Sequence, residues 1–303
     1  MRITVLFYSV IFILFCSSLC SQEIHDTYRE TVPFVTDDKA VSIYNIYGSV
    51  TIEGYDGQDA IVEISKYIEA RSKKGLDQAK EEVEINIENH EGAILVYIED
   101  GNNYFDKKKS HYQSRHHNIR KTRYKYQYNI TVKVPYDTDV AAYAINDGGL
   151  TIQDIDTDEI IASNLNGPIK LQNVSGAIDA NALNEDIDVI YRDNPSEDQY
   201  FNALNGDVNI TVKKGFKGDI YFKSMNGDFY TSIDQNLVKS HTVTEKEVRS
   251  DRSGKSGKTE KAFRKLKVKL HDRERLTIRN GGPDLHFSLL NGDVNLEESN
   301  AIN

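Results

Sequence analysis

A turn of the Asn-Gly type recurs through this chain and constrains its fold more than any other feature of the sequence. The copies are centred on Asn146, Asn166, Asn184, Asn205, Asn226 and Asn291, and an earlier, diverged copy has Tyr47-Gly48 in the same place. Consecutive copies from Asn146 to Asn226 follow a nearly constant period, and the last copy comes after a much longer gap. A period of about 20 residues is typical of repeat proteins, in which each copy is one unit that stacks on the next.

Apolar residues keep a constant distance from these turns. They stand six and four positions before the turn and three and five after it, as Ile160, Ala162, Ile169 and Leu171 do around Asn166. Because this spacing alternates, each repeat is predicted to hold two short strands. A further apolar row directly precedes the turns: Ile46, Ile145, Leu165, Leu183, Leu204, Met225 and Leu290. We predict that this row also stacks inside the core, so that Leu204→Asp would prevent folding.

These patterns predict an all-β fold. A repeat of about 20 residues cannot bury its own apolar face, whereas stacked copies can share a core. We therefore predict a parallel β-solenoid-like stack of repeats that follows an irregular β-rich N-terminal part; the alternative is an antiparallel β-sandwich of hairpins. Glycine suits the corners because it adopts positive φ without steric cost. The turn residues given this structural role are Asn166, Gly167, Asn205, Gly206, Asp207, Asn226, Gly227, Asp228, Asn291, Gly292 and Asp293.

The N-terminal segment has the layout of a secretory signal peptide. An apolar run from Ile3 to Phe15 follows Arg2, and Ser18 and Cys20 form a small-x-small pattern before a cut at Ser21. A single-pass anchor and a lipoprotein acylated at Cys20 are the alternatives. After the cut, the mature chain lacks Cys16 and Cys20, so it carries no lipid, no free thiol and no disulfide. We expect an exported protein in the periplasm, on the outer surface or outside the cell.

The chain divides into three predicted parts. Residues 1–20 are the signal peptide, residues 21–139 a β-rich N-terminal part, and residues 140–303 the strand-repeat domain. Within the N-terminal part, residues 124–134 alternate strictly between apolar and other side chains, which predicts a long strand. Residues 72–82 predict a short surface helix.

Two basic inserts interrupt an acidic chain, whose formal net charge is −10. Residues 107–125 hold 8 Lys/Arg and no acid, and residues 239–275 hold 13 Lys/Arg and 6 acids. We expect solvated loops; the functional alternative is a patch that binds an acidic glycan, lipid head groups or an acidic protein face. The candidate patch residues are Lys107, Lys108, Lys109, Arg115, Arg120, Lys121, Arg123 and Lys125. Nucleic acid is not an expected partner, because the chain is acidic and is predicted to be exported.

The sequence contains no residue pattern typical of catalysis. No Ser-His-Asp order, thiol nucleophile or phosphate-binding glycine loop occurs, so we predict a protein that is not an enzyme and has no cofactor. The histidines within residues 111–117 lie among positive charges that disfavour a metal ion, and no metal site is predicted. The corner residues Asp207, Asp228 and Asp293 are expected to accept hydrogen bonds from local backbone.

The chain resembles the bacterial putative-adhesin domain family, a β-strand-repeat family of unknown function that is common in Bacteroidetes. The resemblance lies in Val-Lys-Val-Pro at residues 132–135, in residues 140–148 and in the Asn-Gly-Asp copies. Residues 279–283 followed by 290–294 look like a common ending of the family, and the match covers residues 39–303. The resemblance implies an exported, solenoid-like β domain without known catalytic residues.

Together these features predict an exported, non-catalytic, adhesin-like interaction module of the cell envelope or surface. Its expected partner is a glycan or protein of that envelope or surface. The alternative is a protein that binds or cleaves acidic polysaccharide. A shallow groove lined by several aromatic side chains and a carboxylate pair would favour this alternative, whereas polar corners on a smooth stack would favour the interaction module.

Overall fold

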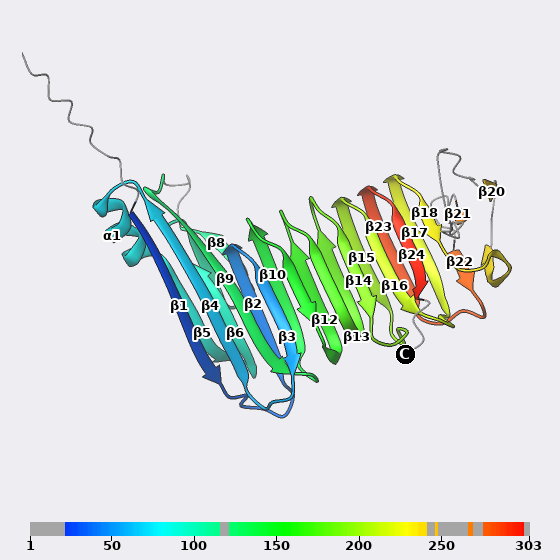
Figure 1. Ribbon diagram of the computed structural model, residues 1–303, viewed down its shortest axis with the longest axis horizontal. Helices are drawn as coiled ribbons and strands as arrows, with labels where there is room; N and C mark the ends of the chain where they lie inside the picture. Colours follow the sequence, from blue (N-terminus) through cyan, green and yellow to red (C-terminus); the bar gives the residue numbers. More distant parts are fainter. Residues whose placement is uncertain (1–21, 116–120, 241–245, 248–265, 269–274, 300–303) are drawn as a thin grey trace, which may run out of the picture.

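The structure is a computed structural model that describes residues 22–115, 121–240, 246–247, 266–268 and 275–299. Strands dominate it, with one α-helix and one short 3-10 helix among these residues, so the predicted all-β class is confirmed (Figure 1). The predicted signal peptide lies outside the described residues. Within the described ranges, none of the helices combines the length and the apolar character needed to cross a membrane.

The elements fall into an N-terminal group, the repeats and a C-terminal group. The first group is β1 (Gln22–Val32), β2 (Ala40–Tyr47), β3 (Val50–Tyr55), β4 (Ala60–Ala70), α1 (Lys73–Glu82), β5 (Glu84–His90), β6 (Ala93–Glu99), β7 (Asn103–Asp106), β8 (His111–Ser114) and β9 (Tyr124–Pro135). The repeats are β10 (Asp139–Asn146), β11 (Leu150–Gln153), β12 (Asp156–Asn164), β13 (Ile169–Ala182), β14 (Ile187–Tyr191), β15 (Gln199–Asn205), β16 (Val208–Lys213), β17 (Gly218–Asn226), β18 (Phe229–Thr231), β23 (Asp284–Asn291) and β24 (Val294–Ser299). The third group is η1 (Gln235–Leu237), β19 (Val238–Ser240), β20 (Lys246–Glu247), β21 (Leu266–Val268) and β22 (Arg275–Ile278). The predicted helix at residues 72–82 is α1, whose N-cap Ser72 accepts a hydrogen bond from the Gly75 N–H.

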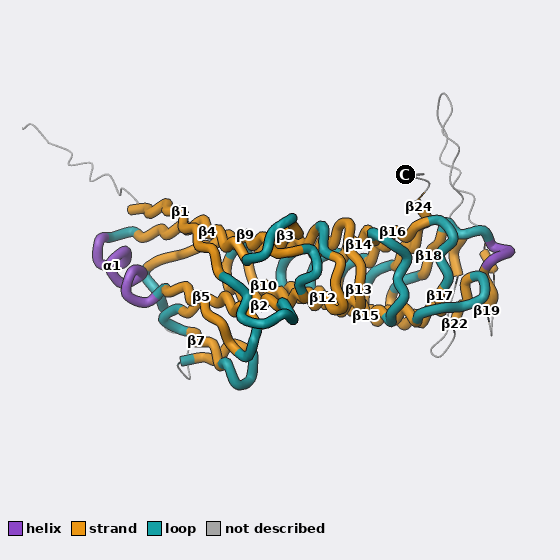
Figure 2. The backbone as a smooth tube through the Cα atoms, turned by 90° about the horizontal axis from the view of Figure 1, so that it is seen from below, coloured by secondary structure: helices purple, strands orange, loops and turns teal. Residues whose placement is uncertain are grey.

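The strands form one large curled sheet of 22 strands, while β7 and β8 pair only with each other. Figure 2 shows that the large sheet has two walls facing each other. We call the wall that contains β2, β10, β12, β15, β23 and β17 the front wall, and the wall that contains β3, β11, β14, β16, β24 and β18 the back wall. The long strand β13 crosses from one to the other: its first half pairs with β14, and its second half with β12 and β15.

Pairing within the sheet is mixed. Neighbouring repeats pair in parallel. Antiparallel pairs occur at both ends of the sheet: β4 pairs in this way with β1 and β9 at one end, and β22 with β17 and β21 with β18 at the other. A wholly parallel solenoid is therefore not confirmed. The hairpin sandwich does not describe the repeats either, because their mutual pairs are parallel.

The alignment of the repeats is confirmed by the register, but their order is not sequential. Equivalent positions pair, as in Val140 with Ile160 and Ile160 with Ile178. The last copy, however, lies between the two copies that precede it in the chain: β23 pairs with both β15 and β17, and β24 with both β16 and β18. The long gap before Asn291 gives the chain enough length to return into this place.

One hydrophobic core runs between the two walls. The residues six and four positions before the turns point into it, as do those three and five after them, and Ile160, Ala162, Ile169 and Leu171 are fully buried. The turn at Asn146 is one residue longer, so Leu150 and Ile152 take the inward places there. Phe201 stacks on Phe287 of the neighbouring strand with 5.3 Å between ring centroids. Burying each large side chain stabilises the fold by about 1.5–3 kcal/mol, so the ladder that extends from coil to coil is the main source of stability.

Candidate functional site

The apolar row that precedes the turns lies on the outside of the front wall, and the prediction that it stacks in the core is wrong. Leu165, Leu204 and Met225 are 41, 37 and 75 % exposed. Successive side chains of a strand point to opposite faces, and Ala162 points inward. Leu165 stands an odd number of residues from Ala162 and must therefore face outward. The same parity, which can be read in the sequence, directs the whole row to the outer side of the strands, where Ile46 is nevertheless buried at 4 % exposure.

Five members of this row form one side of an open groove of about 850 Å³ along the front wall: Ile145, Leu165, Leu183, Leu204 and Leu290. Neighbouring strands place the side chains of the row about 4.8 Å apart, so that they make a continuous apolar stripe. A row of short polar side chains runs beside it, including Ser163, Asn181, Asn202 and Ser288. The apolar members of the lining are Ile145, Leu165, Leu183, Leu204, Leu289 and Leu290, together with alanines and the tyrosines described next.

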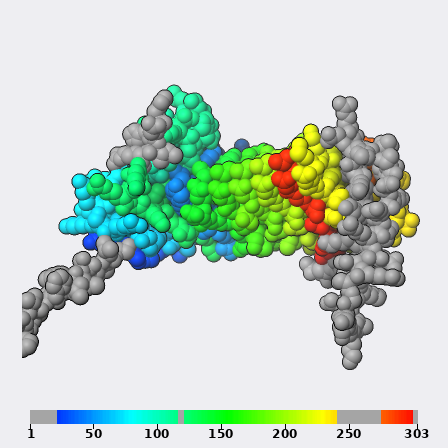
Figure 3. Space-filling view, turned by 90° about the horizontal axis from the view of Figure 1, so that it is seen from above, coloured from blue at the N-terminus to red at the C-terminus, as the bar shows by residue number. Residues whose placement is uncertain are grey.

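One end of the groove is closed by a flap, which we define as the β7–β8 hairpin, residues 103–114. It stands out from the body of the molecule in Figure 3. Beneath it, Tyr44 stacks on Tyr143 with 4.6 Å between ring centroids and an angle of 4° between ring planes. Phe105 of the flap packs on Tyr44 at 4.4 Å. The hydroxyl of Tyr112 donates to the Tyr44 carbonyl oxygen (2.9 Å) and accepts from the Ile98 N–H (3.2 Å).

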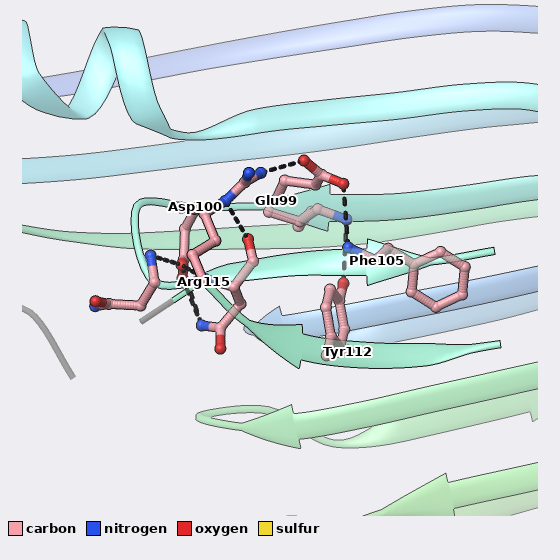
Figure 4. Close-up of polar contacts among 8 residues, drawn as sticks. Glu99, Asp100, Phe105, Tyr112 and Arg115 are labelled. Carbon is pink, nitrogen blue, oxygen red and sulfur yellow. Dashed lines mark hydrogen bonds and ion pairs between the residues drawn. The ribbon is translucent and has the colours of Figure 1, made fainter. Parts of the chain in front are cut away.

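Charged side chains hold the base of the flap in place (Figure 4). The carboxylate of Glu99 accepts a hydrogen bond from the Phe105 N–H (3.1 Å) and forms an ion pair with Arg115. Arg115 Nε also donates to the carbonyl oxygens of Asp100 (3.1 Å) and Asn103 (3.3 Å). One strand of the flap is thereby fastened to β6 and the other to the loop that leads into it.

A buried carboxylate anchors the same loop. Asp100 is only 5 % exposed, and its Oδ1 accepts from the backbone N–H groups of Asn102 and Asn103, each at 2.7 Å. Its Oδ2 accepts from the hydroxyl of Tyr126 at 2.8 Å. These bonds satisfy a charge that would otherwise be costly to bury. Tyr44, Tyr112 and Tyr143 lie in separate segments and carry no shared sequence motif, so the sequence did not identify this end of the groove.

The tyrosines of this region are neutral hydrogen-bond donors. Burial, reinforced by Tyr143, raises the pKa of Tyr44 to about 12. Burial also raises the pKa of Tyr112 and, together with the nearby Asp100 carboxylate, that of Tyr126. A phenol with a raised pKa stays protonated at neutral pH. These groups therefore stabilise the flap as donors and do not supply a base.

The predicted turn residues align in ladders along one edge of the front wall. Every turn asparagine after Asn146 donates from Nδ2 to Oδ1 of the asparagine in the adjacent repeat, at 2.7–3.2 Å. The chain of bonds runs through Asn146, Asn166, Asn184, Asn205, Asn291 and Asn226. The corner carboxylates form a parallel ladder, in which Asp207 Oδ1 accepts from the Asp293 N–H, and Asp293 Oδ1 from the Asp228 N–H, both at 2.8 Å. For Asp207 and Asp293 the expectation of a bond to local backbone is wrong, because the donor belongs to the adjacent repeat.

The corner glycines are required by close packing between coils. A Cβ on Gly167 would lie 2.1 Å from the Gly148 carbonyl oxygen, and one on Gly227 would lie 1.8 Å from that of Gly292. Among the described corner glycines, only Gly48 and Gly292 have positive φ, at 114° and 141°. The prediction that the corners need glycine for positive φ is thus wrong for Gly148, Gly167, Gly206 and Gly227, where steric space decides.

The candidate anion patch is divided by the structure. Lys107 pairs with Glu88, Lys109 with Asp106 and Arg115 with Glu99, so these cations of the flap region are neutralised. No ion pair of Lys108 occurs among the described residues. Three other members, Lys121, Arg123 and Lys125, gather beside α1, and Arg120 lies outside the described residues.

No metal-binding set is present in the part of the chain that the structure describes: no three His, Cys, Asp or Glu side chains come together as ligands. Of the histidines in the predicted cluster, His111 lies on the flap, where its Nδ1 is 2.8 Å from the Lys109 carbonyl oxygen. The other two, at 116 and 117, lie outside the described residues.

Comparison with known proteins places this chain beside solved adhesion proteins at low sequence identity. No protein-family model matches it, and no curated protein matches it. A putative cell adhesion protein of Clostridium sporogenes is 10 % identical, with a TM-score of 0.43 over 91 % of this chain and 100 % of the other. A putative adhesin of Bacteroides fragilis is 9 % identical, with a TM-score of 0.33 over 92 % and 97 %. A putative lipid binding protein of Parabacteroides distasonis is 10 % identical, with a TM-score of 0.25 over 90 % and 96 %. The resemblance to adhesins that the motifs indicated is confirmed to this extent: solved structures that resemble this chain are described as putative adhesins.

Proposed function

We propose that this protein is an exported, non-catalytic interaction module that recognises its partner along the groove of the front wall. The observation that carries the proposal is the outward-facing row of Leu165, Leu183, Leu204 and Leu290. A sheet exposes single apolar side chains without consequence, but a contiguous apolar stripe typically marks an interaction site. Here the stripe is repeated from coil to coil and continues to the aromatic side chains beneath the flap.

The scaffold suits such a role. We propose that the repeats coil as a β-solenoid whose successive turns present the same outward side chains. Each added coil lengthens the binding surface by about 4.8 Å without changing its chemistry. The inner ladder, the corner glycines and the asparagine bonds keep the coils in register, so the outer row is held rigidly before a partner arrives.

A protein or another apolar surface fits this groove better than an acidic polysaccharide. Its lining contains the aromatic side chains of Tyr44, Tyr112 and Tyr143 at one end but no carboxylate and no lysine or arginine. Glycoside hydrolysis needs a pair of carboxyl groups across the bond that is cleaved. Recognition of an acidic polymer needs cations. Binding without catalysis is therefore the function that these side chains support.

Export completes the proposal and rests on the predicted signal peptide. A cut at Ser21 would release a chain that begins immediately before β1 and lacks cysteine. The adhesin-like role that we propose requires this location, since a surface partner is accessible only from outside the cytoplasm.

The test is a binding assay on intact producing cells and on their envelope fraction. The double variant Leu165→Asn/Leu204→Asn should fold as the wild type does, and its affinity in saturable binding should fall at least tenfold. The matched control is Ile190→Asn, since Ile190 is 47 % exposed but lies on β14 of the back wall. The control should bind as the wild type does. Equal binding by the double variant and the wild type, at unchanged melting temperature, would refute the groove as the recognition site.

A further inference from the structure

A second surface lies at the end of the molecule that carries α1, far from β15 and β23, whose side chains line the open part of the groove (Figure 1). The chain enters the fold here, because Gln22 of β1 pairs with Ala70 of β4, and Ala70 pairs with Tyr124 of β9. Arg71 and Arg123 adjoin this three-strand edge in the sequence. The start of β1 and the segments around α1 therefore share one end of the sheet.

Cations line two hollows at this end. The first contains Arg71, Lys121, Arg123 and Lys125, with Glu69 as its single carboxylate. The second adds Lys73 and Lys74 from the start of α1 and also contains acids of that helix. All six of these cations are exposed. We call this set of six side chains the basic end.

The cations of the basic end gather at one end of the molecule and are not neutralised by direct ion pairs. Among the described residues, no ion pair joins Arg71, Lys121, Arg123 or Lys125 to a carboxylate. Some cations elsewhere are paired directly: Lys133 lies 3.2 Å from Glu53, and Arg279 lies 2.9 Å from Glu298. In a chain whose formal net charge is −10, such a concentration of unpaired positive charge is available for an anionic partner.

We propose that the basic end binds the anionic head groups of a phospholipid membrane. Charge complementarity supports an anionic surface, and the entry of the chain at this end supports a membrane. The predicted signal peptide precedes β1 directly, so the basic end is the part of the fold next to the segment that we expect to engage the membrane; this step rests on the proposed export. A basic end against the membrane would leave the long front wall directed away from it. The proposal does not depend on the groove having a partner.

The test measures sedimentation of the protein with vesicles, using its mature form beginning at Ser21. One vesicle preparation contains phosphatidylcholine alone, and the other contains phosphatidylcholine with phosphatidylglycerol. Binding is expected only to the second, and it should fall steeply as salt is raised, because exposed charges are screened over about 8 Å at physiological ionic strength.

Variants identify the surface. Lys121→Gln/Arg123→Gln/Lys125→Gln should weaken vesicle binding at least tenfold. The matched control Lys213→Gln/Lys214→Gln/Lys217→Gln removes three lysines at the end of β16 and in the turn to β17, and it should bind as the wild type does. The groove variant Leu165→Asn/Leu204→Asn should also bind vesicles normally, which separates this proposal from the proposed function.

Three results would overturn the proposal. Equal binding to both vesicle preparations would show that charge is not recognised. Undiminished binding by the first triple variant would place the site elsewhere. Binding of a soluble acidic glycan without binding of anionic vesicles would make the basic end a glycan site.

Discussion

Gly292 lies so close to Gly206 of the adjacent coil that a Cβ on Gly292 would come within 2.0 Å of the Gly206 carbonyl oxygen. The two residues are far apart in the sequence and equivalent in the repeat. The same turn also joins Asn291 to Asn205 through a hydrogen bond of 2.8 Å. Close backbone approach and a side-chain ladder thus fix the last copy into its place between two earlier ones.

Replacing a corner glycine should destabilise the fold sterically. A Cβ on Gly206 would lie 2.3 Å from the Glu185 carbonyl oxygen. Because this oxygen belongs to the backbone, no side-chain movement can relieve the clash, and the two repeats must move apart. We expect Gly206→Ala to lower the free energy of unfolding by at least about 2 kcal/mol, as overpacking does. Gly149→Ala is the control, since the nearest atom to its Cβ would be at 3.5 Å, and it should cost no more than about 0.5 kcal/mol. Urea unfolding compares the two; equal stabilities would contradict the stacking geometry.

Phe201 and Leu204, three positions apart on β15, should differ strongly in their response to substitution. Leu204 faces outward, so Leu204→Asp should fold and change the free energy of unfolding by about 1 kcal/mol or less. Phe201 is fully buried, and Phe201→Ala should cost about 3–5 kcal/mol. Thermal melts followed by circular dichroism measure both. An unfolded Leu204→Asp variant would mean that the row lies in the core after all.

The sequence predicts the repeats, their register and the all-β class because these depend on local periodicity. Parity also determines that Leu204 faces outward when Phe201 faces inward, so the groove could be predicted from the strand pattern. The position of β23 between β15 and β17 could not, since every copy offers the same ladder residues and any order of stacking satisfies the pattern. The flap could not be predicted either, because the contacts of Tyr112 with Tyr44 join distant segments that share no motif.

Alkaline pH should destabilise the protein through its buried tyrosines. An unfolded tyrosine ionises near pH 10. In the folded protein burial raises the pKa of Tyr44 and of Tyr128, each to about 12. The folded state therefore keeps protons that the unfolded chain loses. The contribution of these tyrosines to the free energy of unfolding is fully present below about pH 10 and is lost as the pH rises from there through 12.

Urea unfolding on both sides of pH 10, together with tyrosinate absorbance, measures this effect. Tyr44→Phe keeps the ring stacking and should lessen the alkaline loss of stability relative to the wild type. Two results would contradict the burial of Tyr44 and Tyr128: a free energy of unfolding that rises above pH 10, or ionisation of all tyrosines near pH 10 as in the unfolded chain.

The groove itself can be examined directly because the mature chain is predicted to contain no cysteine. Leu204→Cys and Ile190→Cys would each carry one environment-sensitive fluorophore, the first in the groove and the second on the back wall. On addition of the envelope fraction of the producing cells, we predict a blue shift and protection from a soluble quencher for the label at 204 and no change at 190. A response only at 190, or the same response at both positions, would contradict the assignment of the front-wall groove as the recognition site.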